Sequence, residues 1–319
     1  MIFTESQFKK FAEPLSQSEK ASCLRAINMV KGALEDLAYT ELEPLSNLFE
    51  EENAYMLKMQ SQSKTEQITI FIQGSYANNT NIRGDSDVDI AVVRENVFFP
   101  IFRSNQTNAN YGFVNAGETP KQFKDTVQKC LLKKFGYSVQ RKNKSIKVHG
   151  NSYRKDADVV PCNRQRDYRG EFLNNSENFI GGIVIFSDEG EKIVNYPEQH
   201  IKNGRAKNVE TNYFYKKIVR IAKNIKSLMS EQGLCIANEV SSFALESLLW
   251  NIPSEVYLLD NASLINRFRL CLAYLKKHSS EIEKFKEANG IKNLCQTTEM
   301  KQNLIKFIQE MHQFVQYQG

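Results

Sequence analysis

Short apolar runs rich in β-branched residues, separated by polar loops, characterise the middle of the chain. Residues 66–72 (EQITIFI) and 86–93 (SDVDIAVV) each have the length and composition of a β-strand. Residues 145–150 (SIKVHG) and 156–162 (DADVVPC) flank a polar turn and predict a β-hairpin. From residue 211 onward the apolar positions recur at helical spacing. The pattern therefore predicts a sheet followed by a helical region.

Helices are also predicted before and within the sheet region. Residues 4–60 are mostly helical in pattern, with an interruption near Pro44, and predict a spine that braces two lobes. A helix is predicted over residues 118–135, because Thr119 followed by proline is a typical helix start. Residues 191–210 are polar and weakly patterned, which predicts a crossing between the lobes.

These elements together predict an α+β, bilobal protein with a mixed β-sheet core. The expected divisions are a long N-terminal helical spine (1–63), a sheet-containing core (64–195) and a C-terminal helical lobe (196–319). A chain of 319 residues with 41% hydrophobic composition can bury a core of that size. No apolar run approaches the length of a membrane span, and residues 1–3 lead into a polar helix, so we expect a cytoplasmic protein without membrane partners.

Two carboxylates share one face of the strand predicted at 86–93. Side chains alternate along a strand, so Asp87 and Asp89 point one way while Val88 points the other. Two anionic groups this close repel one another unless a cation lies between them, and Mg²⁺ prefers oxygen ligands of this kind. Taken alone, the tripeptide could also be a solvated edge strand.

A small-residue turn precedes these carboxylates. Gly74 and Ser75 follow the strand predicted at 66–72, where glycine lets the backbone turn and approach a ligand closely. Backbone N–H groups and the Ser75 hydroxyl can bind a triphosphate at such a turn. A Gly-Ser pair alone is usually only a turn. Its position between a strand and the paired aspartates makes the combination more specific than either part.

A third carboxylate is needed to complete a two-metal site, and the second strand of the predicted hairpin offers two. Asp156 and Asp158 lie on the same face, so alternation does not choose between them. Asp158 is preferred because it directly precedes two valines, which places it deeper in the sheet. Asp156, beside a lysine, has the pattern of a solvated turn residue, and so has Asp85.

The Gly-Ser turn, the Asp-Val-Asp pair and the ADVVP strand resemble the polymerase-β-type nucleotidyltransferases. Within that superfamily they are most similar to the branch of cyclic GMP-AMP synthase and its bacterial cGAS/DncV-like relatives in anti-phage defence. The likeness extends over residues 66–253. It implies a polymerase-β-like fold and the synthesis of a cyclic di- or trinucleotide messenger from NTPs with two Mg²⁺ ions, for which Mn²⁺ could substitute. The implied catalytic residues and metal ligands are Asp87, Asp89 and Asp158.

The resemblance also implies a triphosphate clamp, by which we mean Lys223, Ser242 and Phe243. The lysine and the serine would grip the triphosphate from two successive helices, and the aromatic ring would stack on a base. The family often has tyrosine at the position of Phe243, so stacking would survive here but a hydroxyl contact would not.

The residues of the clamp also have simpler interpretations. Apolar positions at helical spacing place one face of the segment around 214–228 on a core, and its basic residues on the other side. A charge run of this kind is typically a solvated helix face. Ser241 or Ser242 could cap the following helix, which is compatible with phosphate binding. The basic residues are Lys216, Lys217, Arg220, Lys223 and Lys226.

Composition argues against several other chemistries. The six cysteines are scattered without a CxxC pair, which favours reduced core thiols over zinc ligands or disulfides. The zinc-bearing insertion with which animal cyclic GMP-AMP synthase holds DNA is therefore not expected. The four histidines are also dispersed, and a net charge of +5 needs no nucleic-acid duplex as a partner.

Two other functions stay open. The same site could make linear products or nucleotidylate a protein, a tRNA or a small molecule. The chain could also be a non-catalytic nucleotide-binding regulator, although such a protein does not need three mutually repelling acids. As partners, the resemblance implies an effector activated by the cyclic nucleotide and an E1/E2-like conjugating enzyme, for which the slim terminal Gly319 is suited.

Overall fold

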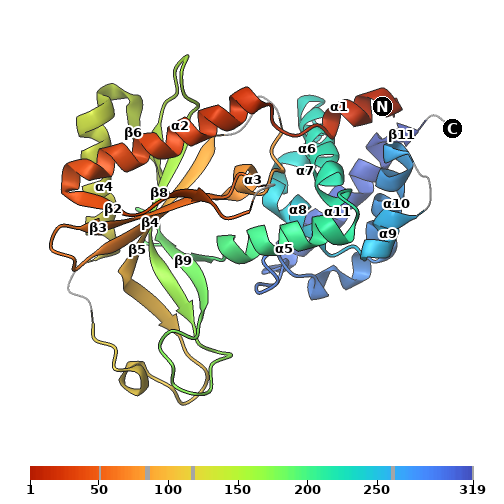
Figure 1. Cartoon of the computed structure of the whole chain (residues 1–319). Helices are drawn as coiled ribbons and strands as arrows, with labels where there is room; N and C mark the ends of the chain where they lie inside the picture. Colours follow the sequence, from red (N-terminus) through yellow and green to blue (C-terminus); the bar gives the residue numbers. More distant parts are fainter. Residues whose placement is uncertain (50–51, 83–86, 116–118, 260–262, 318–319) are drawn as a thin grey trace. The chain divides into compact units, whose positions relative to one another are not determined.

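The computed structural model describes residues 1–49, 52–82, 87–115, 119–259 and 263–317 (Figure 1). Asp85 and Gly319 lie outside these described residues. The chain forms two compact units. The helical unit comprises Met1–Leu15, Asn78–Asp85 and Gln199–Gly319, and the sheet unit comprises Ser16–Ala77 and Ser86–Glu198. The segment that follows the Gly-Ser turn therefore belongs to the helical unit.

A mixed β-sheet forms the core of the sheet unit, with the strand order β10-β9-β8-β5-β4-β3-β2 and the β6–β7 hairpin attached to β8. β5 and β8 pair in parallel, whereas the neighbouring pairs are antiparallel. The strands are β2 (Tyr39–Asn47), β3 (Tyr55–Ser61), β4 (Gln67–Ile72), β5 (Val88–Ile101), β6 (Val139–Arg141), β7 (Ile146–Val148), β8 (Ala157–Asp167), β9 (Ile180–Phe186) and β10 (Lys192–Asn195). The strands predicted at 66–72 and 86–93 and the hairpin are confirmed.

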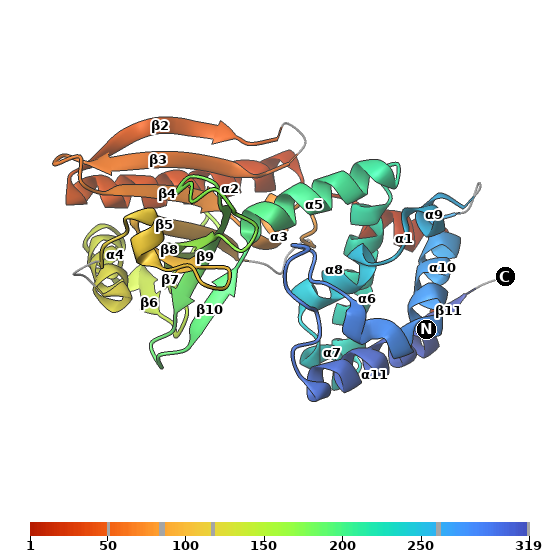
Figure 2. The same ribbon diagram turned by 90° about the horizontal axis from the view of Figure 1, so that it is seen from below.

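Two long helices of the sheet unit pack against each other and against the sheet, α2 on β4 and β5, and α4 on β8 (Figures 1 and 2). Both begin with a capping box, at Ser16 and at Thr119, which satisfies backbone N–H groups at the helix start. The helix predicted over 118–135 is thus confirmed. The helical segments are α2 (Gln17–Leu34), α3 (Gly74–Ala77), α4 (Pro120–Phe135), η1 (Glu35–Leu37), η2 (Asn108–Tyr111) and η3 (Gly136–Ser138).

The predicted N-terminal spine is wrong in its second half. Residues 39–47 and 55–61 form strands β2 and β3, and the helical part is divided into α1 (Glu5–Phe11) in the helical unit and α2 in the sheet unit. β2 is the edge strand and is mostly exposed, so its sequence lacks the alternation that marks a half-buried strand. Pro44 falls where the pairing of β2 with β3 shifts register, as expected for proline in an edge strand.

The sheet has two different faces near its centre. Val88, Ile90 and Val92 of β5 are fully buried. They share a face of the strand with Arg94, whose guanidinium lies over the ring of Phe123 in α4, so this face points toward α4. Asp89 lies on the opposite face of β5. An apolar cluster follows on that same face, and it consists of Phe71, Ala91, Val93, Val160, Cys162, Ile183 and Ile185. The carboxylates therefore lie beside a packed core, on the face away from α4.

The helical unit encloses one large apolar core, to which α1, α6, α8, α10 and α11 contribute. Within this unit, strand β1 near the start of the chain pairs in parallel with strand β11 near its end. Residues 197–210 form helix α5, and the division between the two units falls within the crossing predicted at 191–210, between Glu198 and Gln199. The remaining elements are β1 (Ile2–Phe3), α5 (Pro197–Glu210), α6 (Tyr215–Glu231), α7 (Ile236–Glu239), α8 (Ser242–Trp250), α9 (Ser254–Leu258), α10 (Leu264–Lys277), η4 (Ser279–Lys284), α11 (Thr298–Phe314) and β11 (Gln316–Tyr317).

Within the described ranges, none of the helices is long and apolar enough to cross a membrane. Burial of cysteine thiols matches the expectation of core thiols at most positions, with Cys235 as an exposed exception. The buried thiols are those of Cys23, Cys130, Cys162 and Cys271.

Candidate functional site

The Gly-Ser turn opens α3 directly after β4. Gly74 has a φ of +68°, in the left-handed region that favours glycine. A Cβ at this position would lie 2.6 Å from Oδ2 of Asp89, so a side chain here would collide with that carboxylate. The backbone N–H of Gln73 donates to the carbonyl oxygen of Asp89 at 2.9 Å. The structure thus brings the turn at Gly74 and Ser75 against one of the predicted carboxylates.

Strand register and side-chain alternation bring the carboxylates together. The parallel register of β5 and β8 pairs Asp89 with Asp158 on neighbouring strands. Asp87 lies one residue before β5 begins and has the parity of Asp89. Oδ1 of Asp158 accepts a hydrogen bond from the hydroxyl of Ser145 at 3.2 Å. We call Asp87, Asp89 and Asp158 the carboxylate site.

Burial and mutual repulsion raise the pKa values of Asp89 and Asp158. Burial is the largest cause of the shift at Asp89, and the charges of Asp158 and Asp87 add to it, so its pKa rises to about 7. Burial and the charge of Asp87 likewise raise the pKa of Asp158. Without a bound cation, the site therefore resists holding its full negative charge.

Asp156 has different surroundings from Asp158, although the two share a parity. Its Oδ1 accepts the backbone N–H of Gly150 at 2.7 Å, and its Oδ2 lies 3.0 Å from Nζ of Lys147. The hydrogen bond from Gly150 is the main cause that lowers the pKa of Asp156, and Lys147 contributes further. Asp156 therefore stabilises the turn between β7 and β8, whereas Asp158 lies in register with Asp89.

A lysine already neutralises part of the carboxylate site. Nζ of Lys147 lies 2.7 Å from Oδ2 of Asp87. Among the residues that the structure describes, no three His, Cys, Asp or Glu side chains are grouped as ligands of one metal ion. The donors nevertheless fit a hard divalent cation, because they are carboxylate oxygens, and burial and neighbouring carboxylates raise the pKa values of Asp89 and Asp158.

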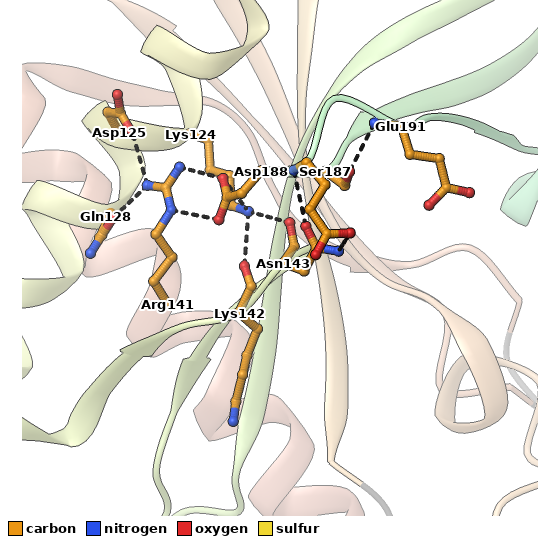
Figure 3. A network of polar contacts seen from close by, with 10 residues as sticks. Lys124, Asp125, Gln128, Arg141, Lys142, Asn143, Ser187, Asp188 and Glu191 are labelled. Carbon is orange, nitrogen blue, oxygen red and sulfur yellow. Dashed lines mark hydrogen bonds and ion pairs between the residues drawn. The ribbon is translucent and has the colours of Figure 1, made fainter.

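The β6–β7 hairpin, which carries Ser145 and Lys147, is held by a polar network (Figure 3). Arg141 donates to both carboxylate oxygens of Asp188 and also to Asp125 of α4. Lys124, 3% exposed, donates to the carbonyl oxygens of residues 142 and 143 in the hairpin turn. The network fixes the hairpin that presents a hydroxyl and an ammonium to the carboxylate site.

The clamp residues lie in the helical unit, and Lys223 has a carboxylate partner there. Its Nζ donates to Glu246 at 2.8 Å and to Thr80 at 3.1 Å. His200 Nε2 lies 2.9 Å from the other oxygen of Glu246. We call Thr80, His200, Lys223 and Glu246 the buried network, since their relative exposures range from 0% to 6%. Burial alone would raise the pKa of Glu246, but Lys223 and His200 together hold it well below its usual range.

This burial corrects the prediction of a solvated basic face. Lys216, Arg220 and Lys223 are all buried. Arg220 donates to the carbonyl oxygens of Ala12 and Asn79, and so connects α6 to segments distant in sequence. The binding of a triphosphate by Lys223 stays a prediction.

The start of α8 carries the other two clamp residues. Ser241 is the N-cap, whose hydroxyl accepts the backbone N–H of Ala244 at 3.0 Å, so Ser242 is the first residue of the helix and is exposed. Phe243 is 37% exposed, and its ring lies edge-on to that of His200 at 5.0 Å between centroids. The exposed Ser242 and Phe243 are accessible to a ligand.

Two family models match the chain: a nucleotidyltransferase domain over residues 56–167, and the C-terminal helical domain of cGAS/DncV-like nucleotidyltransferases over residues 202–316. The chain is 45% identical to the cyclic GMP-AMP synthase CdnE03 of Staphylococcus schleiferi, over 100% of this chain and 98% of that protein. It therefore belongs to the cGAS/DncV-like nucleotidyltransferases. The family resemblance read from the sequence is confirmed, and the protein is an enzyme of the nucleotidyltransferase class.

Other relatives of this cGAS/DncV-like nucleotidyltransferase bear different product names. A cyclic dipyrimidine nucleotide synthase CdnE from Cecembia lonarensis is 33% identical over 92% of this chain and 90% of that protein. The solved structure of the CdnE c-UMP-AMP synthase from Rhodothermus marinus, with Apcpp and Upnpp, is 27% identical and matches with a TM-score of 0.75. It covers 97% of this chain and 96% of that chain, which confirms the expected α+β, polymerase-β-like fold.

Several residues at the two sites of this nucleotidyltransferase have no sequence motif that marks them. Lys147 had no motif to mark it, although its parity in β7 matches that of Asp158 across the hairpin. Glu246 lies in α8 downstream of the helix cap and His200 is one of the dispersed histidines, so neither carries a motif. The partners of each are distant in sequence, so their pairing had no local signal.

Proposed function

We propose that this enzyme joins nucleoside triphosphates into a cyclic di- or trinucleotide messenger for anti-phage signalling. The proposal is carried by the register of Asp89 with Asp158 beside the turn at Gly74, a geometry suited to phosphoryl chemistry on a triphosphate. The cyclic product is supported by the similarity over the whole chain to a cyclic GMP-AMP synthase.

Divalent ions are the expected cofactor, since nucleotidyltransferases generally use them. Asp87, Asp89 and Asp158 would hold two Mg²⁺ ions, or Mn²⁺ in their place. Bound there, the ions supply the positive charge that lowers the pKa of the acceptor hydroxyl and neutralises the leaving pyrophosphate. The carboxylate of Asp158 would accept the proton of the acceptor's ribose hydroxyl.

The chain's own donors bind the nucleotide. Backbone N–H groups at Gly74 and the hydroxyl of Ser75 bind the triphosphate in the sheet unit. Lys223 and Ser242 of the helical unit contribute a charge and a hydroxyl, and the half-exposed ring of Phe243 stacks on a base. A second transfer, with the linear intermediate reversed, closes the ring.

A linear product is the competing possibility for the same site. The purified protein is incubated with all four labelled NTPs and Mg²⁺, the reaction is treated with phosphatase, and the resistant products are identified by mass spectrometry. A cyclic product has no phosphatase-sensitive end and survives, whereas a linear oligonucleotide is degraded at its terminal phosphates. Phosphatase-sensitive products alone would refute the cyclisation.

Substitutions test the metal ligands separately. Replacing both Asp87 and Asp89 with Asn is expected to abolish synthesis and to leave the fold intact, because removing repelling charges rarely destabilises a protein. Asp158→Asn should abolish synthesis as well, and Asp156→Asn should have a far smaller effect on the rate. Retained Mg²⁺-dependent synthesis by the double variant would contradict the two-metal assignment.

A further inference from the structure

Lys147 occupies the position of a built-in cation at the carboxylate site. Its Nζ lies 2.7 Å from Oδ2 of Asp87 and 3.0 Å from Oδ2 of Asp156, and its side chain is only 20% exposed. In the antiparallel pairing of β7 with β8, Lys147 is opposite Asp158, so the two side chains share a face. One ammonium group therefore contacts carboxylates from the segments just before β5 and just before β8.

The contact with Asp87 is incompatible with a metal ion on the same oxygen. Mg²⁺ needs its ligand oxygens at about 2.0–2.1 Å, and an ammonium group 2.7 Å from the same oxygen would be held close to a divalent charge. Like charges at such a separation repel strongly in a partly buried site. The ammonium must withdraw when the ion enters.

Asp156 gives the ammonium a place to go. It already lies within hydrogen-bond distance of Nζ, and its other oxygen is fixed by the N–H of Gly150 at 2.7 Å. The lysine side chain has four flexible bonds. A small rotation about them moves Nζ from its shared contact with Asp87 and Asp156 to contact with Asp156 alone. Asp156 is not part of the carboxylate site, so this contact leaves the three proposed ligands free.

We propose that Lys147 is an internal counter-ion, which pairs with Asp87 in the metal-free enzyme and withdraws to Asp156 when a divalent ion binds. The inference rests on the proposed function, in that it assumes a metal site at Asp87, Asp89 and Asp158. Its consequence is that Lys147 weakens metal binding, because each ion must displace an ammonium group. It also holds the metal-free site together.

Mn²⁺ affinity of the full chain, measured by the paramagnetic resonance signal of the free ion, tests this directly. Lys147→Met keeps the side-chain length and removes the charge. It should strengthen Mn²⁺ binding by about tenfold to a hundredfold, the range expected for removing a competing charge-assisted hydrogen bond, and should lower the melting temperature without metal. Lys142→Met is the control. Lys142 is exposed and acts on Asp158 only through its charge, so Mn²⁺ affinity should change less than about threefold.

Asp156→Asn supplies a result of opposite sign, and does not require that Lys147→Met folds. It removes the alternative partner, so Lys147 stays on Asp87 and Mn²⁺ should bind more weakly than to the wild type. The counter-ion role of Lys147 would be refuted if Lys147→Met and Lys142→Met changed Mn²⁺ affinity equally. It would also be refuted if Asp156→Asn left Mn²⁺ affinity unchanged. Mn²⁺ binding that persists in the Asp87→Asn/Asp89→Asn variant would instead overturn the metal site of the proposed function.

Discussion

Lys223 gives the sharpest test, because two roles predict different outcomes for the same substitution. Its side chain is 5% exposed and its partner Glu246 is 2% exposed, with 2.8 Å between Nζ and Oε2. Lys223→Met keeps the length of the side chain but leaves the carboxylate of Glu246 buried without the lysine charge, in contact with Thr80 and His200. Removing one partner of a buried ion pair costs about 3–5 kcal/mol, so the free energy of unfolding in urea should fall by that amount.

A double variant separates this structural role from the triphosphate clamp. Lys223→Met/Glu246→Gln removes both charges, and Gln can still bond to Thr80 and His200, so most of the lost stability should return. If Lys223 also grips the triphosphate, NTP affinity stays about tenfold to a hundredfold weaker in the double variant, as for the loss of a charge-assisted hydrogen bond. Recovery of both quantities would show that Lys223 only stabilises the fold.

Lys226→Ala on the same helix is the matched control, with little effect expected on either quantity. The reasoning about burial would be refuted if Lys223→Met unfolded at the same urea concentration as the wild type. Isothermal titration with a non-hydrolysable NTP gives the affinity, and circular dichroism gives the unfolding curve.

Three further predictions follow from single sites. Gly74→Ala should lose stability and synthesis together, because a Cβ would meet a carboxylate oxygen at 2.6 Å, whereas Gly112→Ala, at a similar φ of +70° with no atom within 4 Å, should cost about 1–2 kcal/mol and spare synthesis. Phe243→Ala should weaken NTP affinity by about 1–3 kcal/mol through lost stacking, with an unchanged unfolding curve. Arg141 lowers the pKa of Asp188 to about 2, so this ion pair contributes stability above pH 4 that is lost as the pH falls toward 2, and Asp188→Asn should remove that part of the acid denaturation profile.

Local pattern predicted the strands of the catalytic sheet but not all of their extent. The β-branched runs at 67–72 and 88–93 are buried on both faces near the sheet centre, where composition is a strong signal. β5 continues to Ile101 through a register shift after Arg94, and this irregularity interrupts the alternation. β2 was missed because an exposed edge strand has no apolar face to read. β3 lies between β2 and β4 and buries Leu57 and Met59, but it fell within the helical pattern assigned to residues 4–60.

The grouping of the three carboxylates was predictable from the sequence, whereas their partners were not. Strand alternation and the spacing from the Gly-Ser turn selected Asp87 and Asp89, because both are properties of one short segment. The preference for Asp158 over Asp156 came from two neighbouring valines, and the structure places Asp158, not Asp156, in register with Asp89. Lys147 lies 60 residues from Asp87, so only the tertiary fold joins them.

The lysine–carboxylate pairs Lys147–Asp87 and Lys223–Glu246 differ in a way that identifies which site can take another cation. Glu246 receives both Lys223 and His200, and its pKa lies well below the usual range, so its charge is already compensated. Within the part of the chain that the structure describes, no cation compensates Asp89: burial and two neighbouring carboxylates raise its pKa to about 7 even though Lys147 neutralises Asp87. A divalent ion would therefore gain little binding free energy at the buried network. It would gain much more at the carboxylate site, because its charge offsets the repulsion among carboxylates there.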